Sequence, residues 1–167
     1  MSSAAVTSLP VTPSIRSRLT TEEHRVRKAL LGCLVAAQGA VGAADVGAAL
    51  GWAPEQAAAI IAALVAKKLV VQDEHGRVKS AYPVSSVATS HRVTLADGRT
   101  LYAMCAIDAL GCFFEFGQPL QIDASCHVCG APLQITLSFA EQVASMPSGV
   151  YATHVDLNKY DDWAAKT

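Results

Sequence analysis

Charge and aromatic side chains are scarce in this sequence, and it has no long apolar run. Charged residues make up 16% of the 167 residues and aromatic residues 6%, whereas hydrophobic residues make up 51%. Thirteen lysines and arginines stand against 14 aspartates and glutamates, which gives a formal net charge of −1. The chain therefore lacks the basic field that draws a protein onto nucleic acid or anionic lipid. It is apolar enough to bury a core, so we expect a folded protein.

We also find no sequence pattern of a signal peptide or of a membrane-spanning segment. Residues 1–19 are rich in Ser, Thr and Pro, and no apolar core of a signal peptide follows Met1. The longest apolar stretches, Ala29–Val41 and Ala57–Ala66, are too short to cross a bilayer. We expect a cytoplasmic protein with a flexible tail over residues 1–19 and no membrane partner.

Cysteine is present in an odd number, five. In a cytoplasmic chain, an odd set of cysteines favours reduced thiols with metal-binding or catalytic roles over a framework of disulfides.

Residues 20–83 have the pattern of a winged helix-turn-helix. Thr20 or Thr21 can cap a first helix that contains Glu22 and Glu23 in its first turn. Three helices followed by a β-hairpin are typical of that motif. The expected helices run from Thr21 to near Gly39, Ala43–Leu50 and Pro54–Lys68, and the expected strands are Leu69–Gln72 and Val78–Tyr82.

The third helix of this unit is a poor reader of DNA. After Glu55 and Gln56 it presents mainly alanines, whereas recognition helices display Arg, Lys, Asn or Gln to base edges. Arg77 and Lys79 in the hairpin are too few cations for strong binding to phosphates. We therefore favour a packing or dimerisation role for this unit and do not expect a DNA partner.

Residues 84–167 predict a mixed β core with short helices, so the fold class is α+β. Period-two alternation and turn residues mark the strands, and alanine-rich runs mark the helices. The expected strands are Val84–Leu95, Thr100–Tyr102, Pro119–Asp123, Pro132–Ser138 and Val150–Leu157, and the expected helices are Ala103–Leu110, which Gly111 ends, and Phe139–Val143. We predict three parts: a tail over 1–19, a winged-helix-like domain over 20–83 and a thiol-site core over 84–167.

Cys105 and Asp108 form the most informative pair in the core. They lie three residues apart in an apolar run, so in a helix they share one face and can reach one ligand. A thiolate is a soft metal ligand, and an apolar pocket raises the pKa of a carboxyl toward neutrality, which suits a proton carrier.

The Cys126–Cys129 pair allows three interpretations. A Cys-x-x-Cys turn can point both sulfurs at one ion, but structural zinc needs four ligands, which Cys105 and His154 could complete only if the fold brought them close. The two thiols could instead be turn residues without a ligand. The interpretation that we favour is a cluster of Cys105, Cys126 and Cys129 beside Asp108 that binds a thiophilic metal.

A family resemblance rests on residues Leu101–Leu110, on Cys126 21 positions after Cys105, and on the run Gly130–Ser138. These segments resemble the core of the organomercurial (alkylmercury) lyase family. The resemblance extends more weakly over residues 25–155 and implies a winged-helix-like domain before a mixed β catalytic core.

The resemblance implies roles for individual residues. Cys105 matches a catalytic thiolate, Asp108 matches the proton carrier, Tyr102 matches a residue that packs over the site, and Cys126 matches a structural cysteine. We predict that Tyr102 and Cys126 contact the substrate. The family's second catalytic cysteine falls at Ala152, just before His154, so we predict Cys129 as the replacement thiol and His154 as an additional metal ligand. The implied reaction is protonolysis of a carbon–metal bond.

Three functions follow as hypotheses. The first is an organomercurial lyase-like protein that cleaves or binds organometallic or Hg(II)-type ligands, requires no cofactor, can retain Hg(II) or another thiophilic metal, and works with a small-thiol reductant. The second is a non-catalytic thiol or metal-binding protein, or a metal-responsive winged-helix regulator. The third is an enzyme that uses the Cys105 and Asp108 pair on a non-mercurial substrate.

Overall fold

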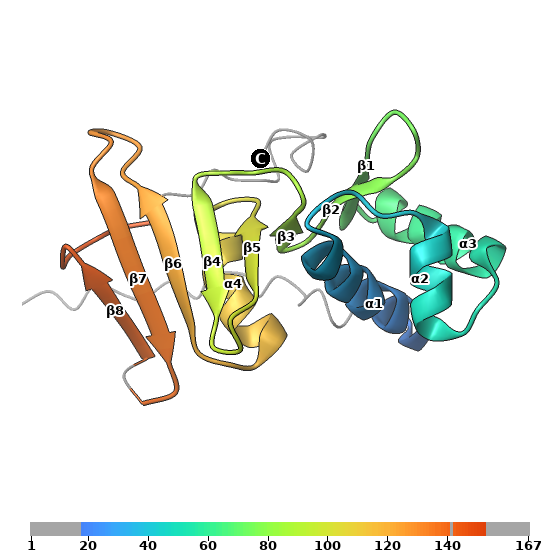
Figure 1. The fold of residues 1–167 in the computed structure, drawn as a ribbon, viewed down its shortest axis with the longest axis horizontal. Coiled ribbons are helices and arrows are strands. Elements are labelled where there is room, and N and C mark those ends of the chain that lie inside the picture. Colours follow the sequence, from blue (N-terminus) through green and yellow to red (C-terminus); the bar gives the residue numbers. More distant parts are fainter. Residues whose placement is uncertain (1–17, 141, 153–167) are drawn as a thin grey trace, which may run out of the picture.

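A single eight-stranded sheet runs through the molecule, with a three-helix unit at one end (Figure 1). The structure is a computed structural model that describes residues 18–140 and 142–152. The strand order is β1-β2-β3-β5-β4-β6-β7-β8, and every pair of neighbours is antiparallel. The predicted α+β fold class is confirmed.

The first helix, α1 (Thr21–Ala37), begins at the predicted cap. The Thr20 hydroxyl accepts the backbone N–H of Glu23 at 3.2 Å, and the Glu23 carboxylate accepts the N–H of Thr20 at 2.7 Å. This reciprocal arrangement satisfies two backbone donors that a helix start leaves unpaired. The helix ends at Gln38, which adopts a left-handed conformation, close to the predicted Gly39.

Helices α2 (Ala43–Leu50) and α3 (Pro54–Ala66) complete the three-helix unit. The turn between them passes close to α2 at Gly47, where a Cβ atom would lie 2.9 Å from the carbonyl oxygen of Trp52. Pro54 occupies the first turn of α3, where its missing N–H costs nothing. Within the described residues, no one helix has the length and apolar character to cross a membrane, and α2 and α3 meet that test only together, as a pair bent by 114°.

Strands β1 (Val70–Gln72) and β2 (Val78–Ala81) form the predicted hairpin. Two backbone hydrogen bonds between Val41 and Val78 attach this hairpin to the segment before α2. The Arg77 guanidinium donates to the carbonyl of Ala40, so this hairpin cation is engaged within the protein.

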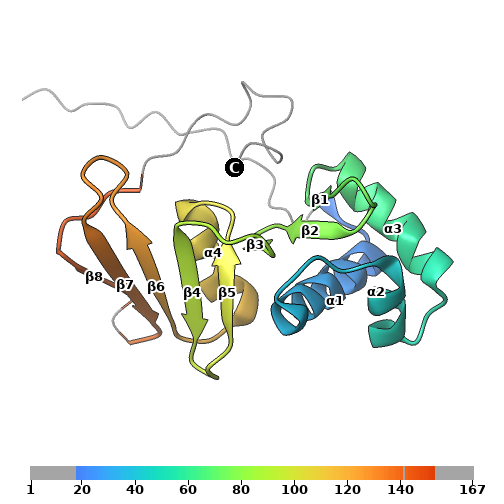
Figure 2. The same cartoon turned by 45° about the horizontal axis from the view of Figure 1, so that its top comes forward.

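The sheet continues from the hairpin into the second half of the chain without a break (Figure 2). Its remaining strands are β3 (Val84–Ser85), β4 (His91–Leu95), β5 (Thr100–Ala103), β6 (Leu120–Ser125), β7 (Pro132–Ser138) and β8 (Gln142–Met146). Strand β3 pairs with β2 on one side and with β5 on the other. The predicted boundary between residues 83 and 84 therefore falls inside one sheet; the division into domains stays a prediction.

Three predicted elements of the second half were wrong in part. Val84–Leu95 is two strands, because the Ser85 hydroxyl bonds both the N–H and the carbonyl of Val87 and turns the chain out of the sheet. Phe139–Val143 is not a helix, since β8 begins at Gln142 and pairs with β7. Residues 150–152 lie outside any strand, and the rest of the predicted strand Val150–Leu157 falls outside the described residues.

Helix α4 (Ala106–Phe116) covers one face of the central strands β4, β5 and β6 (Figures 1 and 2). Side chains alternate along the strands, and the buried set on this face includes Val93, Leu101 and Ile122. Ala109 of α4 belongs to the same core. Helix α4 begins at the end of the sheet where the two central strands β5 and β6 both end.

Candidate functional site

Cys105 is the residue immediately before α4 and caps it. Its Sγ accepts the backbone N–H of Asp108 at 3.4 Å. The predicted helix Ala103–Leu110 was wrong at both ends, because Ala103 is paired in β5 and the helix continues through Gly111 to Phe116. It ends at Gly117, whose left-handed backbone suits a glycine.

Asp108 lies in the first turn of α4 and is buried, with 4% of its surface exposed. The Cys105 thiol and the Asp108 carboxylate are hydrogen-bonded to each other. The sequence spacing predicted that both reach one ligand, which stays a prediction. A buried carboxylate with a thiol as donor is a natural acceptor for that thiol's proton.

The pKa of the Cys105 thiol is raised to about 11. Burial is the largest cause, and the neighbouring Asp108 carboxylate adds to it. Backbone N–H groups of Asp108 and Ile107 oppose the rise, since donors at a helix start favour a thiolate, but they are outweighed. At neutral pH the sulfur therefore carries its proton.

Tyr82 is a site residue that the sequence analysis missed. Its hydroxyl is hydrogen-bonded to the Asp108 carboxylate, and burial together with the charge of Asp108 raises the pKa of Tyr82 to about 12. The hydroxyl lies 4.0 Å from where a Cβ on Gly111 would stand, so the ring reaches across to α4. Its position after a short strand and before Pro83 gave no signal of this contact.

Arg27 of α1 connects α4 and Tyr82 to the helical unit. Its guanidinium donates to both carboxylate oxygens of Glu115 on α4, at 3.1 and 2.8 Å. It also donates to the carbonyl oxygen of Tyr82 at 2.6 Å. A bidentate ion pair of this kind fixes the orientation of the guanidinium as well as its distance from the carboxylate. Arg27 therefore sets the position of α4 relative to Tyr82.

Cys112, one helical turn after Asp108, is fully buried. Burial, followed by the charges of Asp108 and Glu115, raises the pKa of its thiol far above the ordinary range. It packs in the core as a small apolar side chain.

Cys126 and Cys129 lie in the turn that joins β6 to β7. The Gly130 N–H donates to the Cys126 carbonyl, and the Cys126 N–H to the Ala131 carbonyl, both at 2.8 Å. The Cys126 sulfur accepts hydrogen bonds from the N–H groups of Cys129 and Val128 and from the Cys129 thiol, and these bonds lower the pKa of Cys126. The two sulfurs therefore face each other.

The β6–β7 turn and the start of α4 lie at the same end of the sheet's strands. The turn follows β6, whereas α4 follows β5. Tyr102 of β5 and Asp123 of β6 both pair with Arg92 of β4, so β5 and β6 run in the same direction and end at the same edge. Strand β4 separates them, which places the two strands roughly 10 Å apart. Among residues 18–140 and 142–152, no three His, Cys, Asp or Glu side chains gather in a group that could hold a metal ion. The predicted cluster of Cys105, Cys126 and Cys129 is therefore not assembled in the described structure, because β4 separates Cys105 from the turn that carries the other two thiols.

Of two other predicted site residues, Tyr102 lies apart from Cys105, and His154 is not among the described residues. Tyr102 points to the face of β5 opposite its buried neighbours Leu101 and Ala103, and it lines a small hollow beside Leu34 of α1. Ala152 is exposed, and His154 falls outside the described residues.

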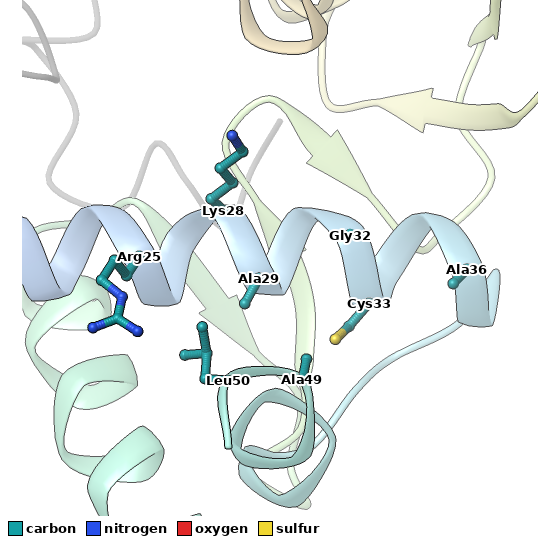
Figure 3. Close-up of a pocket in the computed structure, with 8 residues that line it drawn as sticks. All are labelled: Arg25, Lys28, Ala29, Gly32, Cys33, Ala36, Ala49 and Leu50. Atoms are coloured by element: carbon teal, nitrogen blue, oxygen red, sulfur yellow. The ribbon is translucent and has the colours of Figure 1, made fainter. Parts of the chain in front are cut away.

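A groove with an apolar lining lies elsewhere, between α1 and α2 (Figure 3). It has a volume of about 460 Å³ and an apolar lining that includes Ala29, Cys33 and Leu50. The Cys33 thiol donates to the carbonyl of Asp45 at 3.8 Å, and burial raises its pKa. This groove contains none of the hydrogen-bonded acid and thiol groups found at α4, so we do not place the chemistry there.

Comparison with known proteins agrees with the fold. The family model described as "MerB: Alkylmercury lyase" matches residues 84–167. The alkylmercury lyase of Staphylococcus epidermidis is 33% identical over 104 residues, which are 62% of this chain and 46% of that protein. The alkylmercury lyase of Bacillus cereus is 34% identical over 76 residues, which are 46% of this chain and 34% of that protein.

A solved structure shares the fold. The mercury-bound form of MerB2 superimposes with a TM-score of 0.64 at 20% identity, over 79% of this chain and 63% of that chain. The matched part of the chain therefore spans less than half the length of the curated relatives and under two thirds of the solved one.

Proposed function

Because this chain belongs to the alkylmercury lyase family, we propose that it takes an organomercurial as substrate and cleaves the carbon–mercury bond by protonolysis. The observation that supports the proposal most strongly is the hydrogen-bonded set of Cys105, Asp108 and Tyr82 at the start of α4. It combines a soft ligand for mercury with a buried acceptor for the proton that the ligand must lose.

In the first step mercury bonds to the Cys105 sulfur. A raised pKa means that this sulfur arrives as a thiol, so its proton must leave as the sulfur–mercury bond forms. The Asp108 carboxylate, already hydrogen-bonded to that thiol, accepts the proton. The ligand that mercury carried into the site departs with its electron pair.

In the second step the Asp108 carboxylic acid protonates the carbon bound to mercury. The electron pair of the carbon–mercury bond becomes the new carbon–hydrogen bond, and Hg(II) stays on the Cys105 sulfur. Asp108 returns to its ionised form, to which Tyr82 donates a hydrogen bond. Burial of the carboxyl limits competition from water during the transfer.

We propose that a small thiol from solution supplies the second sulfur and removes Hg(II). Cys112 is fully buried, and Cys129 is hydrogen-bonded to Cys126 in the β6–β7 turn. The sequence-based assignment of Cys129 as the replacement thiol stays a prediction, and a Cys129→Ser variant tests it: an intact rate favours the external thiol.

Hydrocarbon release tests the function. The purified, reduced chain is incubated with an organomercurial and excess small thiol, and the protonated hydrocarbon is quantified. Cys105→Ser and Asp108→Asn should each lower the rate by at least about 100-fold. Cys33→Ser, a thiol change in the helical unit, should leave the rate unchanged. Equal rates in all variants would overturn the proposal.

A second candidate function is capture of a mercurial without cleavage. Ala152 stands where the family has its second catalytic cysteine, which favours this alternative. Tight binding of the organomercurial through Cys105 with no hydrocarbon released would establish it. Metal-responsive regulation and a non-mercurial substrate stay predictions from the sequence.

A further inference from the structure

The turn between β6 and β7 presents two thiols that the cleavage chemistry at Cys105 does not use. Cys126 is partly exposed and Cys129 is exposed, and neither is in a disulfide. Between them His127 and Val128 form the tip of the turn, and Val128 is 91% exposed. An incoming ion therefore reaches both sulfurs without any movement of the core.

The backbone of the turn is set up to hold both sulfurs on one side. Gly130 has a left-handed backbone with φ of 71°, which lets the chain reverse directly after Cys129. Hydrogen bonds of 2.8 Å from the Gly130 N–H to the Cys126 carbonyl, and from the Cys126 N–H to the Ala131 carbonyl, close the turn onto the paired strands. The Cys129 thiol then donates to the Cys126 sulfur.

The number of ligands limits which ion this turn can bind. Zinc in a structural site takes four ligands, and no group of three candidate ligands is found among the described residues. His127 stands between the two cysteines yet belongs to no such group. Two thiolates fully satisfy a soft d¹⁰ cation that accepts linear two-coordination, such as Hg(II).

We propose that Cys126 and Cys129 form a separate dithiol site that binds one thiophilic, two-coordinate metal ion. Binding releases two protons: each thiol loses its proton, and each sulfur forms one bond to the ion. No oxidant and no cleavage of a carbon–metal bond are needed, so the site does not depend on the activity proposed for Cys105. N–H donors to the Cys126 sulfur assist the loss of the first proton.

The test is a titration of the full-length reduced chain with inorganic Hg(II), followed by native mass spectrometry and by the ultraviolet charge-transfer absorption of mercury thiolates. A competing small thiol at increasing concentration then measures how firmly the ion is held. The Cys105→Ser variant should keep one firmly held ion per chain. Adding Cys126→Ser or Cys129→Ser to that variant should release the ion at a competitor concentration at least about tenfold lower, because one sulfur cannot chelate.

Val128→Ala is the matched control, since it alters the same turn and leaves both sulfurs in place. It should hold the ion as the wild type does. Retention of the ion in a Cys105→Ser/Cys126→Ser/Cys129→Ser triple variant would overturn the proposal, as would its loss in Cys105→Ser alone. A stoichiometry of one ion per two chains would also overturn it, because the site would then be shared between copies.

The result is independent of the hydrocarbon-release assay. Failure of the dithiol site appears as weak Hg(II) binding in a chain that still releases hydrocarbon. Failure of the proposed lyase appears as no hydrocarbon from a chain that still holds Hg(II) at the turn.

Discussion

Arg27 on α1 and Glu115 on α4 form a two-pronged ion pair across the junction between the helical unit and the sheet core, with contacts of 3.1 and 2.8 Å. The Arg27 side chain is 8% exposed and that of Glu115 is 24% exposed. The pair therefore lies largely out of water and connects segments far apart in the sequence.

Removing one partner of this pair should destabilise the fold. Glu115→Gln leaves the Arg27 guanidinium buried without its counter-charge, and we expect the free energy of unfolding to fall by about 3 kcal/mol. Urea unfolding followed by circular dichroism measures the change. Arg99→Gln serves as the comparison, because the side chains of its pair with Asp97 are 48% and 41% exposed, and it should cost no more than about 1 kcal/mol. Equal losses would argue against a special role for the Arg27 pair.

Tyr82→Phe should lower the rate of hydrocarbon release by about tenfold, because the hydroxyl bonded to the Asp108 carboxylate is lost while the ring stays. The effect should fall on kcat with little change in KM, since Tyr82 acts through Asp108 and not on the substrate. Tyr151→Phe, a change at a tyrosine that is 90% exposed, provides the control. A rise in KM alone would contradict a positioning role.

Stability should fall as the pH rises above about 9. In the unfolded chain a cysteine deprotonates near pH 9.0, whereas folded Cys105 retains its proton to about pH 11. A tyrosine ordinarily deprotonates near 10.0, whereas Tyr82 does so at about 12. The folded state therefore binds more protons than the unfolded state in this window, so the free energy of unfolding decreases with pH. Urea midpoints measured from pH 7 to 10.5 test this, and the decrease should be smaller in a Cys105→Ser/Tyr82→Phe double variant.

Ala152→Cys should increase the rate of hydrocarbon release at low concentrations of external thiol by at least about tenfold. The family resemblance places the second catalytic cysteine at this position, and a second sulfur on mercury weakens the bond to carbon. Ser148→Cys adds a thiol at another exposed position nearby and should have no effect. An equal gain in both variants would show only that any added thiol helps.

Local signals in the sequence predicted much of the fold. The Thr20 cap, Pro54 at a helix start and the hairpin turn before Val78 each fix local backbone, and the three helices and the hairpin formed close to their expected bounds. The predictions that failed depended on competition between local and distant partners. The segment after Phe139 forms β8 because β7 offers backbone partners, a pairing that local composition does not reveal.

The candidate site was predicted in the same uneven way. The spacing of Cys105 and Asp108 predicted that they share one helical face, whereas Cys105 precedes the helix and caps it, with its Sγ accepting the N–H of Asp108. Tyr82 was missed because its contact with Asp108 depends on how β2 meets α4, which no short-range pattern encodes. The cluster of Cys105 and Cys129 was predicted because the chain lacks the family's second catalytic thiol, whereas in the structure β4 lies between the strands that these two residues follow.

Strand β3 contains only Val84 and Ser85, yet it bridges β2 and β5. A chain shortened to residues 84–167 would keep Cys105, Asp108 and the thiol turn, but it would lose β2 and leave one side of β3 with unpaired N–H and carbonyl groups. It would also lose Tyr82 and Arg27. An exposed edge of this kind recruits strands from other molecules. Dissecting the two halves should therefore yield aggregation of the thiol-bearing half, not an isolated enzyme.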